Sequence, residues 1–381
     1  MTPSRIRRAS VCKVNAVEAA ADLYASLWQP DCSLVLLFVS PDYDLEALAP
    51  ALERYFQGVT IVGCTTAGEI AVNGYHSHSI SGVSLAAPDF YAVTQRIESL
   101  EHFDLSDALG VVMSARHALG VQSGLMIDRR AFAMLLIDGM AACEERVTSQ
   151  LSRALGEVPL FGGSAGDNMR FEKTAVLIDG QFRSHCAALI LIATKYPFEV
   201  FKSEHTARTG ERVVITEADS NQRLVTEINA EPAAAEYARL LGVSVESLSP
   251  RIFATHPLVL QVSGVPYVRS IQRVNPDLSL NFFCAIDEGL VLSGTRTLDI
   301  VDNLAQTFSR LRHRLGPLQL VFGFDCFLRT LPLHDPDAIA RLSNLLAAHN
   351  VVGFNTYGEQ FNAMHVNQTF TGIAIGMGSD E

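Results

Sequence analysis

The chain has 381 residues and a net charge of −12, and it is 48% hydrophobic and 18% charged. This length predicts roughly two to three domains with large cores, and the acidic balance argues against non-specific binding to nucleic acid or an anionic membrane. No apolar stretch reaches the ~20 residues of a membrane-spanning helix, and no apolar core follows the N-terminal basic residues as in a secretory signal. We therefore expect a cytoplasmic protein.

The cysteines also suit a reducing compartment. Their number is odd and no CxxC occurs, which disfavours both a disulfide framework and a thiolate zinc site. The seven residues are Cys12, Cys32, Cys64, Cys143, Cys186, Cys284 and Cys326.

The first half alternates apolar runs, typical of buried strands, with helical patterns. After an N-terminal tail, helices are predicted at residues 17–27, 44–56, 104–119 and 141–155. Strands are predicted at residues 33–40, 59–64, 82–86, 90–97, 131–138, 174–178 and 187–193. The turn Asp179-Gly180 predicts that the last two of these strands form a hairpin.

Composition shifts at Lys195-Tyr196-Pro197, so we expect two domains, residues 1–197 and 198–381. In the second, strands are predicted at residues 213–216, 224–228, 258–262, 267–274, 278–286, 290–294, 318–322 and 369–376. Helices are predicted at residues 231–241, 298–315 and 337–349. The whole is α/β to α+β, with two mixed-sheet modules.

One eight-residue stretch occurs twice, as Val62-Gly63-Cys64-Thr65-Thr66-Ala67-Gly68-Glu69 and as Val352-Gly353-Phe354-Asn355-Thr356-Tyr357-Gly358-Glu359. The match continues at one constant offset, where Ser77 and Ser79 correspond to Asn367 and Thr369. A weaker third copy is Ser164-Ala165-Gly166-Asp167. The shared core is a hydroxyl residue, a small or aromatic residue, Gly and an acid.

Each copy follows an apolar run and a helical run, which predicts three strand–helix–strand units that end in the same kind of loop. A single copy would be interpreted as a tight turn with a solvated or capping carboxylate. Three copies after three similar units predict acids that converge on one pseudo-symmetric cleft.

These residues resemble the FIST family, bacterial intracellular sensory proteins with an N-terminal and a C-terminal module. The motifs that carry the resemblance are residues 63–70, 161–167, 256–258, 267–269, 287–289, 325–326 with Arg329, and 357–359 followed by 365–369. The resemblance implies a small-molecule sensor coupled to a histidine kinase or a cyclic-di-GMP enzyme. Residues 213–216 and 228–234 are similar to the family's haem-containing nitric-oxide sensors, the NosP group.

That similarity implies a b-type haem, since no CxxCH for covalent attachment is present. His205 is the expected iron ligand because it lies at the predicted domain junction, near Arg208 and Arg212, which could meet the haem propionates. Nitric oxide would bind the ferrous iron and change the activity of the partner kinase. Further candidates for the axial position are His256, His365 and Cys186.

The alternative is a FIST sensor for an amino acid or another small polar metabolite. The recurring acids would then contact a cationic group, and Arg269 or Arg329 would contact a carboxylate. The ligand-binding residues expected in this site are Thr66, Gly68, Glu69, Ser164, Gly166, Asp167, Arg269, Arg329, Tyr357, Glu359, His365 and Asn367.

Other chemistry has weaker support in the sequence. His76 and His78 could form a metal pair, but no third ligand is identifiable. A hydrolase using Cys326 or Glu359 would need a base and an oxyanion site that the sequence does not identify. We therefore expect no enzymatic activity and no nucleic-acid or membrane partner, and homodimer formation is left open.

Overall fold

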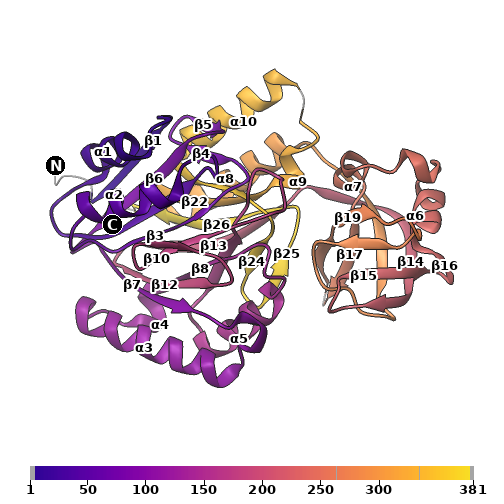
Figure 1. The fold of residues 1–381 in the computed structure, drawn as a ribbon, viewed down its shortest axis with the longest axis horizontal. Helices are drawn as coiled ribbons and strands as arrows, with labels where there is room; N and C mark the ends of the chain where they lie inside the picture. The colour runs from indigo at the N-terminus through magenta and orange to yellow at the C-terminus, as the bar shows by residue number, and fades with distance from the viewer. Residues whose placement is uncertain (1–4, 263, 334, 378–381) are drawn as a thin grey trace.

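The computed structural model describes residues 5–262, 264–333 and 335–377, which form a mixed α/β protein. Three six-stranded sheets make up a body, and an eight-stranded sheet makes up a smaller lobe beside it (Figure 1). The lobe consists of residues 206–297, which we call the insertion. The α/β to α+β class predicted from the sequence is confirmed. Among the described residues, no helix is long and apolar enough to cross a membrane.

Three consecutive units of strands and helices build the body. The first contains β1 (Ile6–Val11), α1 (Ala16–Leu27), β2 (Cys32–Val39), α2 (Leu45–Tyr55), β3 (Ile61–Thr65), β4 (Glu69–Ala71), β5 (Gly74–His76) and β6 (Ile80–Ala86). The second contains β7 (Phe90–Ile97), η1 (Leu100–His102), α3 (Leu105–Ser123), α4 (Ile127–Arg130), β8 (Ala131–Ile137), α5 (Glu144–Leu155), β9 (Leu160–Ser164), β10 (Val176–Ile178), β11 (Gln181–Arg183) and β12 (Ala187–Thr194). The third contains β13 (Phe198–Glu204), α8 (Ile300–Leu315), β22 (Leu318–Cys326), α9 (Phe327–Thr330), α10 (Pro336–Ala348), β23 (Val351–Thr356), β24 (Glu359–Phe361), β25 (Met364–Val366) and β26 (Thr369–Gly376).

The insertion interrupts the third unit between β13 and α8. Its elements are β14 (Thr206–Asp219), β15 (Leu224–Ile228), β16 (Glu231–Pro232), α6 (Ala233–Leu241), η2 (Val245–Ser247), α7 (Pro250–Thr255), β17 (Leu258–Val262), β18 (Val265–Arg269), β19 (Ile271–Val274), β20 (Leu280–Phe282) and β21 (Val291–Thr297). Its sheet has the order β18-β17-β21-β14-β15-β20-β19, with β16 paired to β15, and it encloses a hydrophobic core of its own.

The three units share one strand order. Their four-stranded parts are β1-β6-β2-β3, β7-β12-β8-β9 and β13-β26-β22-β23. In each, the last two strands are parallel and a helix connects them in the sequence. The three predicted strand–helix–strand units are therefore confirmed, and they form a three-fold internal repeat.

Each unit also donates a hairpin to the sheet of a neighbouring unit. The hairpin β4–β5 pairs with β23, β24–β25 pairs with β9, and β10–β11 pairs with β3. The exchange is a closed cycle, so every sheet in the body is completed by another unit. Strand pairing consequently crosses the boundary between residues 197 and 198 in both directions, and the division into 1–197 and 198–381 stays a prediction.

The strands are apolar on both faces because each body sheet lies between two hydrophobic layers. Inner-face residues from all three units form one central core. There the ring of Phe38 stacks on that of Phe354 with 4.9 Å between centroids, and Phe161 stacks on Phe324 at 5.4 Å. The outer faces are covered by the helix pairs α1 and α2, α3 and α5, and α8 and α10.

Polar residues fix where the covering helices begin. Side-chain oxygens accept backbone N–H groups that the first turn of a helix leaves unpaired. Such caps begin α1, α2, α3, α8 and α10, and the capping residues are Asn15, Asp44, Asp104, Asp299 and Asp335.

Several elements differ from the sequence prediction, including the strand predicted at residues 267–274, which is divided into β18 and β19. The expected N-terminal tail forms β1, because its backbone pairs with β6 over its whole length. The turn Asp179-Gly180 joins β10 to β11, while residues 187–194 pair with β7 and β8 in another sheet. The helix predicted from Glu231 begins at Ala233, because Glu231 and Pro232 pair with β15.

The contact between β22 and β23 tests the packing. A Cβ on Gly353 would lie 1.8 Å from the carbonyl oxygen of Gly323, so Gly353→Ala should lower the free energy of unfolding by about 1–3 kcal/mol or more. Gly110, in the interior of α3, has open space around it. Gly110→Ala should raise that free energy by about 0.4–1 kcal/mol. Urea denaturation of both variants measures the difference, and equal effects would contradict this packing.

Candidate functional site

Three strand-end loops, one from each unit, are joined by a closed set of backbone hydrogen bonds. The bonds run from the N–H of Ala67 to the carbonyl of Asn355 (2.9 Å), from Tyr357 to Ser164 (3.2 Å) and from Gly166 to Thr65 (2.9 Å). Each loop donates to one neighbour and accepts from the other. We call residues 65–67, 164–166 and 355–357 the loop ring. The three loops that carry the motif copies therefore meet at one place.

In the ring, the second motif copy is offset by one residue from the alignment that the sequence motif suggests. Because Ser164 takes the position of Thr65 and Asn355, Asp167 does not correspond to Glu69 and Glu359. In the strand registers, the equivalent of these two acids is Val176. The backbone after each hairpin supports this alignment, because the three equivalent residues all have a left-handed conformation: His78 (φ 57°), His185 (φ 54°) and Gln368 (φ 52°).

Glu69 and Glu359 make the same hydrogen bonds in their two units. Glu69 accepts from the hydroxyl of Thr66, and from the backbone N–H (3.1 Å) and hydroxyl (2.7 Å) of Ser79. Glu359 accepts from the hydroxyl of Thr356, and from the backbone N–H (3.2 Å) and hydroxyl (2.7 Å) of Thr369.

Both glutamates are 0% exposed. Burial raises the pKa of Glu69 to about 7 and that of Glu359 to about 8, although the hydroxyl bonds favour the ionised form. The expectation that these acids line an open cleft is therefore wrong. Each hairpin folds back over the loop, so the hydroxyl residue that follows it encloses the carboxyl group.

Asp167 has a different structural role. It accepts backbone N–H groups from Phe171 (2.9 Å), Glu172 (2.7 Å) and Lys173 (3.0 Å), as well as the hydroxyl of Tyr357. Burial alone would raise its pKa, but these hydrogen bonds lower it. Asp167 thus holds the loop between β9 and β10 in place as an ionised acceptor.

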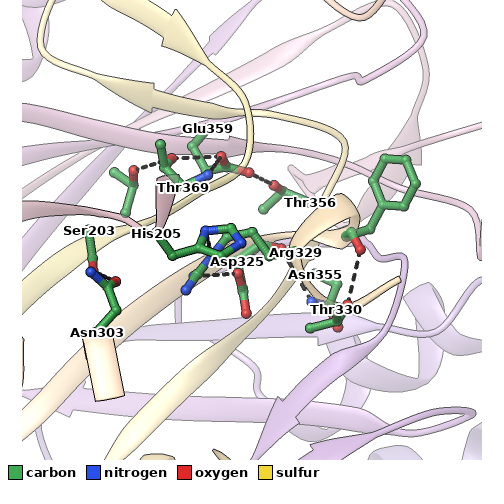
Figure 2. A network of polar contacts seen from close by, with 12 residues as sticks. Ser203, His205, Asn303, Asp325, Arg329, Thr330, Asn355, Thr356, Glu359 and Thr369 are labelled. Carbon is green, nitrogen blue, oxygen red and sulfur yellow. Dashed lines mark hydrogen bonds and ion pairs between the residues drawn. The ribbon is translucent and has the colours of Figure 1, made fainter. Parts of the chain in front are cut away.

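A buried network lies beside the ring (Figure 2). Arg329 Nη1 is 2.7 Å from Asp325 Oδ1, and the hydroxyl of Tyr75 donates to the other oxygen of Asp325. Burial raises the pKa of Asp325 despite the adjacent guanidinium. The Arg329 side chain is 0% exposed. Arg329 is therefore enclosed and paired with Asp325 through Nη1, while its Nη2 has no hydrogen-bond partner among the described residues.

His205, the expected haem ligand, is buried at the same network (Figure 2). Burial and the guanidinium of Arg329 lower its pKa to about 3, so the ring is neutral. Arg329 Nε donates to His205 Nδ1 at 3.4 Å. A neutral imidazole carries one proton, which then sits on Nε2 and leaves no free lone pair for iron. The residues present therefore do not fit a haem with His205 as axial ligand.

The other residues expected around a haem lie apart from this network. Arg208 and Arg212 are exposed on β14. His256 ends α7, with its Nδ1 2.9 Å from the hydroxyl of Thr255. Burial raises the pKa of the Cys186 thiol to about 11, which disfavours the thiolate that a metal ligand needs.

The remaining metal and nucleophile candidates are also engaged or enclosed. His78 pairs with Asp42, and His76 Nδ1 lies 3.9 Å from the sulfur of Cys12. Within the part of the chain that the structure describes, no group of three or more His, Cys, Asp or Glu could hold a metal ion. Cys326 is buried, and burial raises the pKa of its thiol well above the usual value.

A charged contact joins the insertion to α5 of the body. Arg223 lies 2.7 Å from carboxylate oxygens of both Glu144 and Glu145 on α5. Glu145 also accepts the backbone N–H of Ala285 at 2.9 Å. Burial alone would raise the pKa of Glu145, but His365 in its protonated form, the guanidinium of Arg223 and this N–H lower it to about 2. The contact therefore holds an ionised carboxylate.

Aromatic rings extend this contact to the loop ring. Phe171 stacks on Tyr357 with 4.7 Å between ring centroids, and Phe283 of the insertion packs edge-on against Phe327 at 5.5 Å. A small cavity of about 160 Å³ lies here, lined by Glu144, Arg223 and three of these rings. The insertion therefore reaches the loop ring through Phe171 and Phe327, which both pack on Tyr357.

Beside this contact, buried side chains have polar atoms without a hydrogen-bond partner among the described residues. They come from the segment around β24 and β25 of the body and from the junction of β18 and β19 in the insertion. The atoms are Gln360 Oε1, His365 Nε2, Asn367 Oδ1 and Nδ2, Gln368 Oε1, Arg269 Nε and Ser270 Oγ. We call these six residues the polar junction. β25, which carries His365, packs against both α5 and β18, and Gln368 Nε2 donates to the carbonyl of Phe253 at 3.4 Å, so this segment of the body faces the insertion.

The protonation of His365 follows from its neighbours. Gln360 Nε2 lies 3.2 Å from His365 Nδ1, so Nδ1 accepts and Nε2 carries the unpartnered proton. Burial lowers the pKa of His365, while the carboxylates of Glu145 and Glu144 oppose that change. His365 is therefore a neutral donor within the polar junction.

The structure separates the expected ligand residues into three groups. Arg269, His365 and Asn367 lie in the polar junction. The loop ring or its immediate flank contains Thr66, Gly68, Ser164, Gly166 and Tyr357, while Glu69, Asp167, Arg329 and Glu359 are bonded inside the protein.

The prediction missed Gln360, Gln368, Ser270, Arg223 and Glu145. Gln368 was open to detection, because it stands between two matched positions of the repeated segment. No local pattern connects Arg223 with Glu145, because only the docking of the insertion brings them together.

Family models match almost the whole of this architecture. The FIST N domain model matches residues 33–231, and the FIST C domain model matches residues 233–362. The chain therefore belongs to the FIST family. FIST domains indicate a sensory, ligand-binding role in signal transduction.

Two individual proteins are also similar to this chain. An uncharacterised protein of Methanocaldococcus jannaschii, MJ1623, is 20% identical over 89% of this chain and 73% of that protein. A solved cyanuric acid hydrolase from A. caulinodans is similar over 98% of this chain and 99% of its own, with a TM-score of 0.38 and 8% identity. A structural likeness this low carries no argument about function.

The buried carboxyl group of Glu359 makes folding depend on pH. Its folded-state pKa of about 8 is raised above the unfolded value of about 4.3. The folded state therefore binds the proton more tightly, and the resulting stability is full at low pH and is lost as pH rises from about 4.3 towards 8. A tenfold difference in proton affinity between the two states is worth about 1.4 kcal/mol. Glu359→Gln should therefore be more stable than the wild type at pH 8. This advantage should become smaller as the pH is lowered to 5.

Urea unfolding at pH 5, 6.5 and 8 measures this change. Gln keeps the shape and hydrogen-bonding capacity of the neutral acid but does not ionise. Glu157→Gln, at an exposed position, is the matched control and should keep the wild-type pH dependence. Parallel pH profiles for Glu359→Gln and the wild type would show that Glu359 is ionised in the folded protein.

Proposed function

We propose that this FIST protein senses a small polar metabolite with a carboxylate group, such as an amino acid, and binds it at the polar junction. The unpartnered atoms of six buried side chains carry the proposal. Each unpaired buried polar group costs about 1–3 kcal/mol, and folded proteins pair nearly all such groups with protein, water or ligand. A ligand with complementary groups would remove much of this cost.

The polar atoms suggest how such a ligand would lie. Arg269, whose Nε has no partner, is the cation for the carboxylate, because a guanidinium binds this group in a planar, bidentate arrangement. The Nε2 proton of His365 is a second donor. The free side-chain oxygens of Gln360 and Gln368 suit an ammonium or amide group. The arrangement thus favours a dipolar molecule over an anion alone.

Binding at this place would couple to the position of the insertion. Arg269 and Ser270 belong to the insertion, whereas His365 and Asn367 belong to the body. A ligand that contacts both sides would favour one arrangement of the two, and a partner that recognises this arrangement would respond. We propose that the partner is a histidine kinase or a cyclic-di-GMP enzyme, following the signalling role of the family.

Calorimetric titration tests the ligand and its site. The full chain is titrated with the twenty common amino acids and with the amines that their decarboxylation gives. At least one amino acid should bind, and its amine should bind at least tenfold more weakly. Arg269→Met should reduce the affinity about 10- to 100-fold, since a charge-assisted contact is worth about 1.5–3 kcal/mol.

Arg273→Met is the matched control, because Arg273 is exposed on the neighbouring strand β19. It should leave the affinity unchanged. Equal losses in the two variants, or equal binding of amino acid and amine, would contradict carboxylate recognition by Arg269.

Haem-based detection of nitric oxide is the second candidate, and it rests on the resemblance to the NosP group. The hydrogen bond from Arg329 to His205 argues against His205 as the axial ligand of a haem iron. Absorption spectra of protein produced with ample haem decide the matter, with His205→Ala, His256→Ala and His365→Ala for comparison. We expect no Soret band that depends on His205. A band that His205→Ala abolishes would establish haem binding there and exclude the tautomer inferred above.

A further inference from the structure

A larger pocket opens on another side of the loop ring. It lies where the hairpin β4–β5 of the first unit meets β23 and α10 of the third, and its volume is about 490 Å³. Sites for small molecules typically have volumes of about 300–1,000 Å³. Its wall includes Gly68, Tyr75, Ser77, Thr330, Leu342 and Asn355.

The three-fold repeat relates this pocket to the polar junction. Tyr75 and Ser77 occupy in the first hairpin the positions that His365 and Asn367 occupy in the third. Both places are thus joints between a donated hairpin and a neighbouring unit. They lie on different joints, because β4 pairs with β23 and β24 pairs with β9. The pocket is therefore separate from the site proposed above.

Three hydrogen-bond donors in the polar wall are already used inside the protein, while the lining also contains the hydroxyl of Ser77 and the imidazole of His76. The hydroxyl of Tyr75 donates to Asp325, and that of Thr330 donates to the carbonyl of Phe327 at 3.1 Å. The side-chain nitrogen of Asn355 donates to the backbone carbonyl of Asp325 at 3.3 Å. At Tyr75, Thr330 and Asn355 the oxygen lone pairs remain for a ligand, so this part of the wall favours a molecule that brings N–H donors.

The rest of the wall is apolar and the pocket has little charge. Leu333, Ile339 and Leu342 form the apolar part. Among the described lining residues none is Asp, Glu, Lys or Arg, the imidazole of His76 is the one basic side chain, and the nearby Asp325 is already paired with Arg329. An ionised ligand would lose hydration here without gaining a counter-charge.

We propose that this pocket is a second ligand site of the protein, for an uncharged planar molecule with N–H donors on one edge and an apolar ring. Its N–H edge contacts the oxygens of Tyr75, Thr330 and Asn355, and its ring packs on Ile339 and Leu342. The ligand also touches the loop ring at Ala67 and Asn355, so it would favour the joint between the first and third units.

Three probes of one shape test this class: benzamide, which is neutral with N–H donors, benzoate, which is an anion without them, and benzamidine, which is a cation. Each is titrated into the full chain and followed by ligand-observed NMR. Benzamide should bind saturably and at least tenfold more tightly than either charged probe. No saturable binding of benzamide, or tighter binding of a charged probe, would overturn the proposal.

Variants place the binding in this pocket. Ile339 is 39% exposed on α10, so Ile339→Asp should fold while weakening benzamide at least tenfold. Ala340→Asp, next to it and outside the pocket lining, should leave the affinity unchanged. Ser77→Trp, at an exposed position on the opposite wall, should also block benzamide binding. This variant replaces Ile339→Asp as the test of the pocket if Ile339→Asp fails to fold. Wild-type affinity in both pocket variants would overturn the site.

Arg269→Met separates the two sites. Benzamide should bind this variant as it binds the wild type, whatever the fate of the amino-acid titration. A parallel loss of benzamide affinity would show that the probe occupies the polar junction, and would overturn a second site.

Discussion

Three backbone hydrogen bonds, closed into a ring, set the arrangement on which the rest of this protein depends. Each strand-end loop donates to one neighbour and accepts from the other, and each unit lends a hairpin to the next sheet. Buried backbone groups must find partners, and those of the strand-end loops find them across units. The body therefore has no unit whose sheet is complete by itself, although each unit has its own covering helices.

This constraint explains why the repeated motif keeps an acid that does not face an open cleft. In the first and third units a carboxyl group and a hydroxyl group meet under the hairpin, as Glu69 with Ser79 and Glu359 with Thr369. In the second unit, Val176 is the equivalent of the glutamates, and no polar pair is needed. The position thus tolerates either a satisfied polar pair or an apolar one. A carboxyl group without its hydroxyl partner would be costly there.

The insertion breaks the three-fold equivalence of the body. It enters the third unit between β13 and α8, returns to the body through Arg223 and Phe283, and leaves polar atoms unpaired on both sides of the contact. The three-fold repeat alone would give three equivalent joints. The docked insertion makes one of them different, because it places an arginine and a serine opposite the third hairpin. This joint is the place at which we propose that ligand binding and conformation are linked.

The sequence by itself determined the local elements and the equivalence of Glu69 and Glu359. Apolar alternation and capping residues such as Asp104 and Asp299 act within a few residues, so β7, β17 and α8 were predicted close to their observed bounds. The tertiary structure alone decided which strand each hairpin joins, which acids are enclosed, and that Arg223 meets Glu145. These contacts depend on the closure of sheets across units far apart in the chain, and no local pattern of residues encodes that closure.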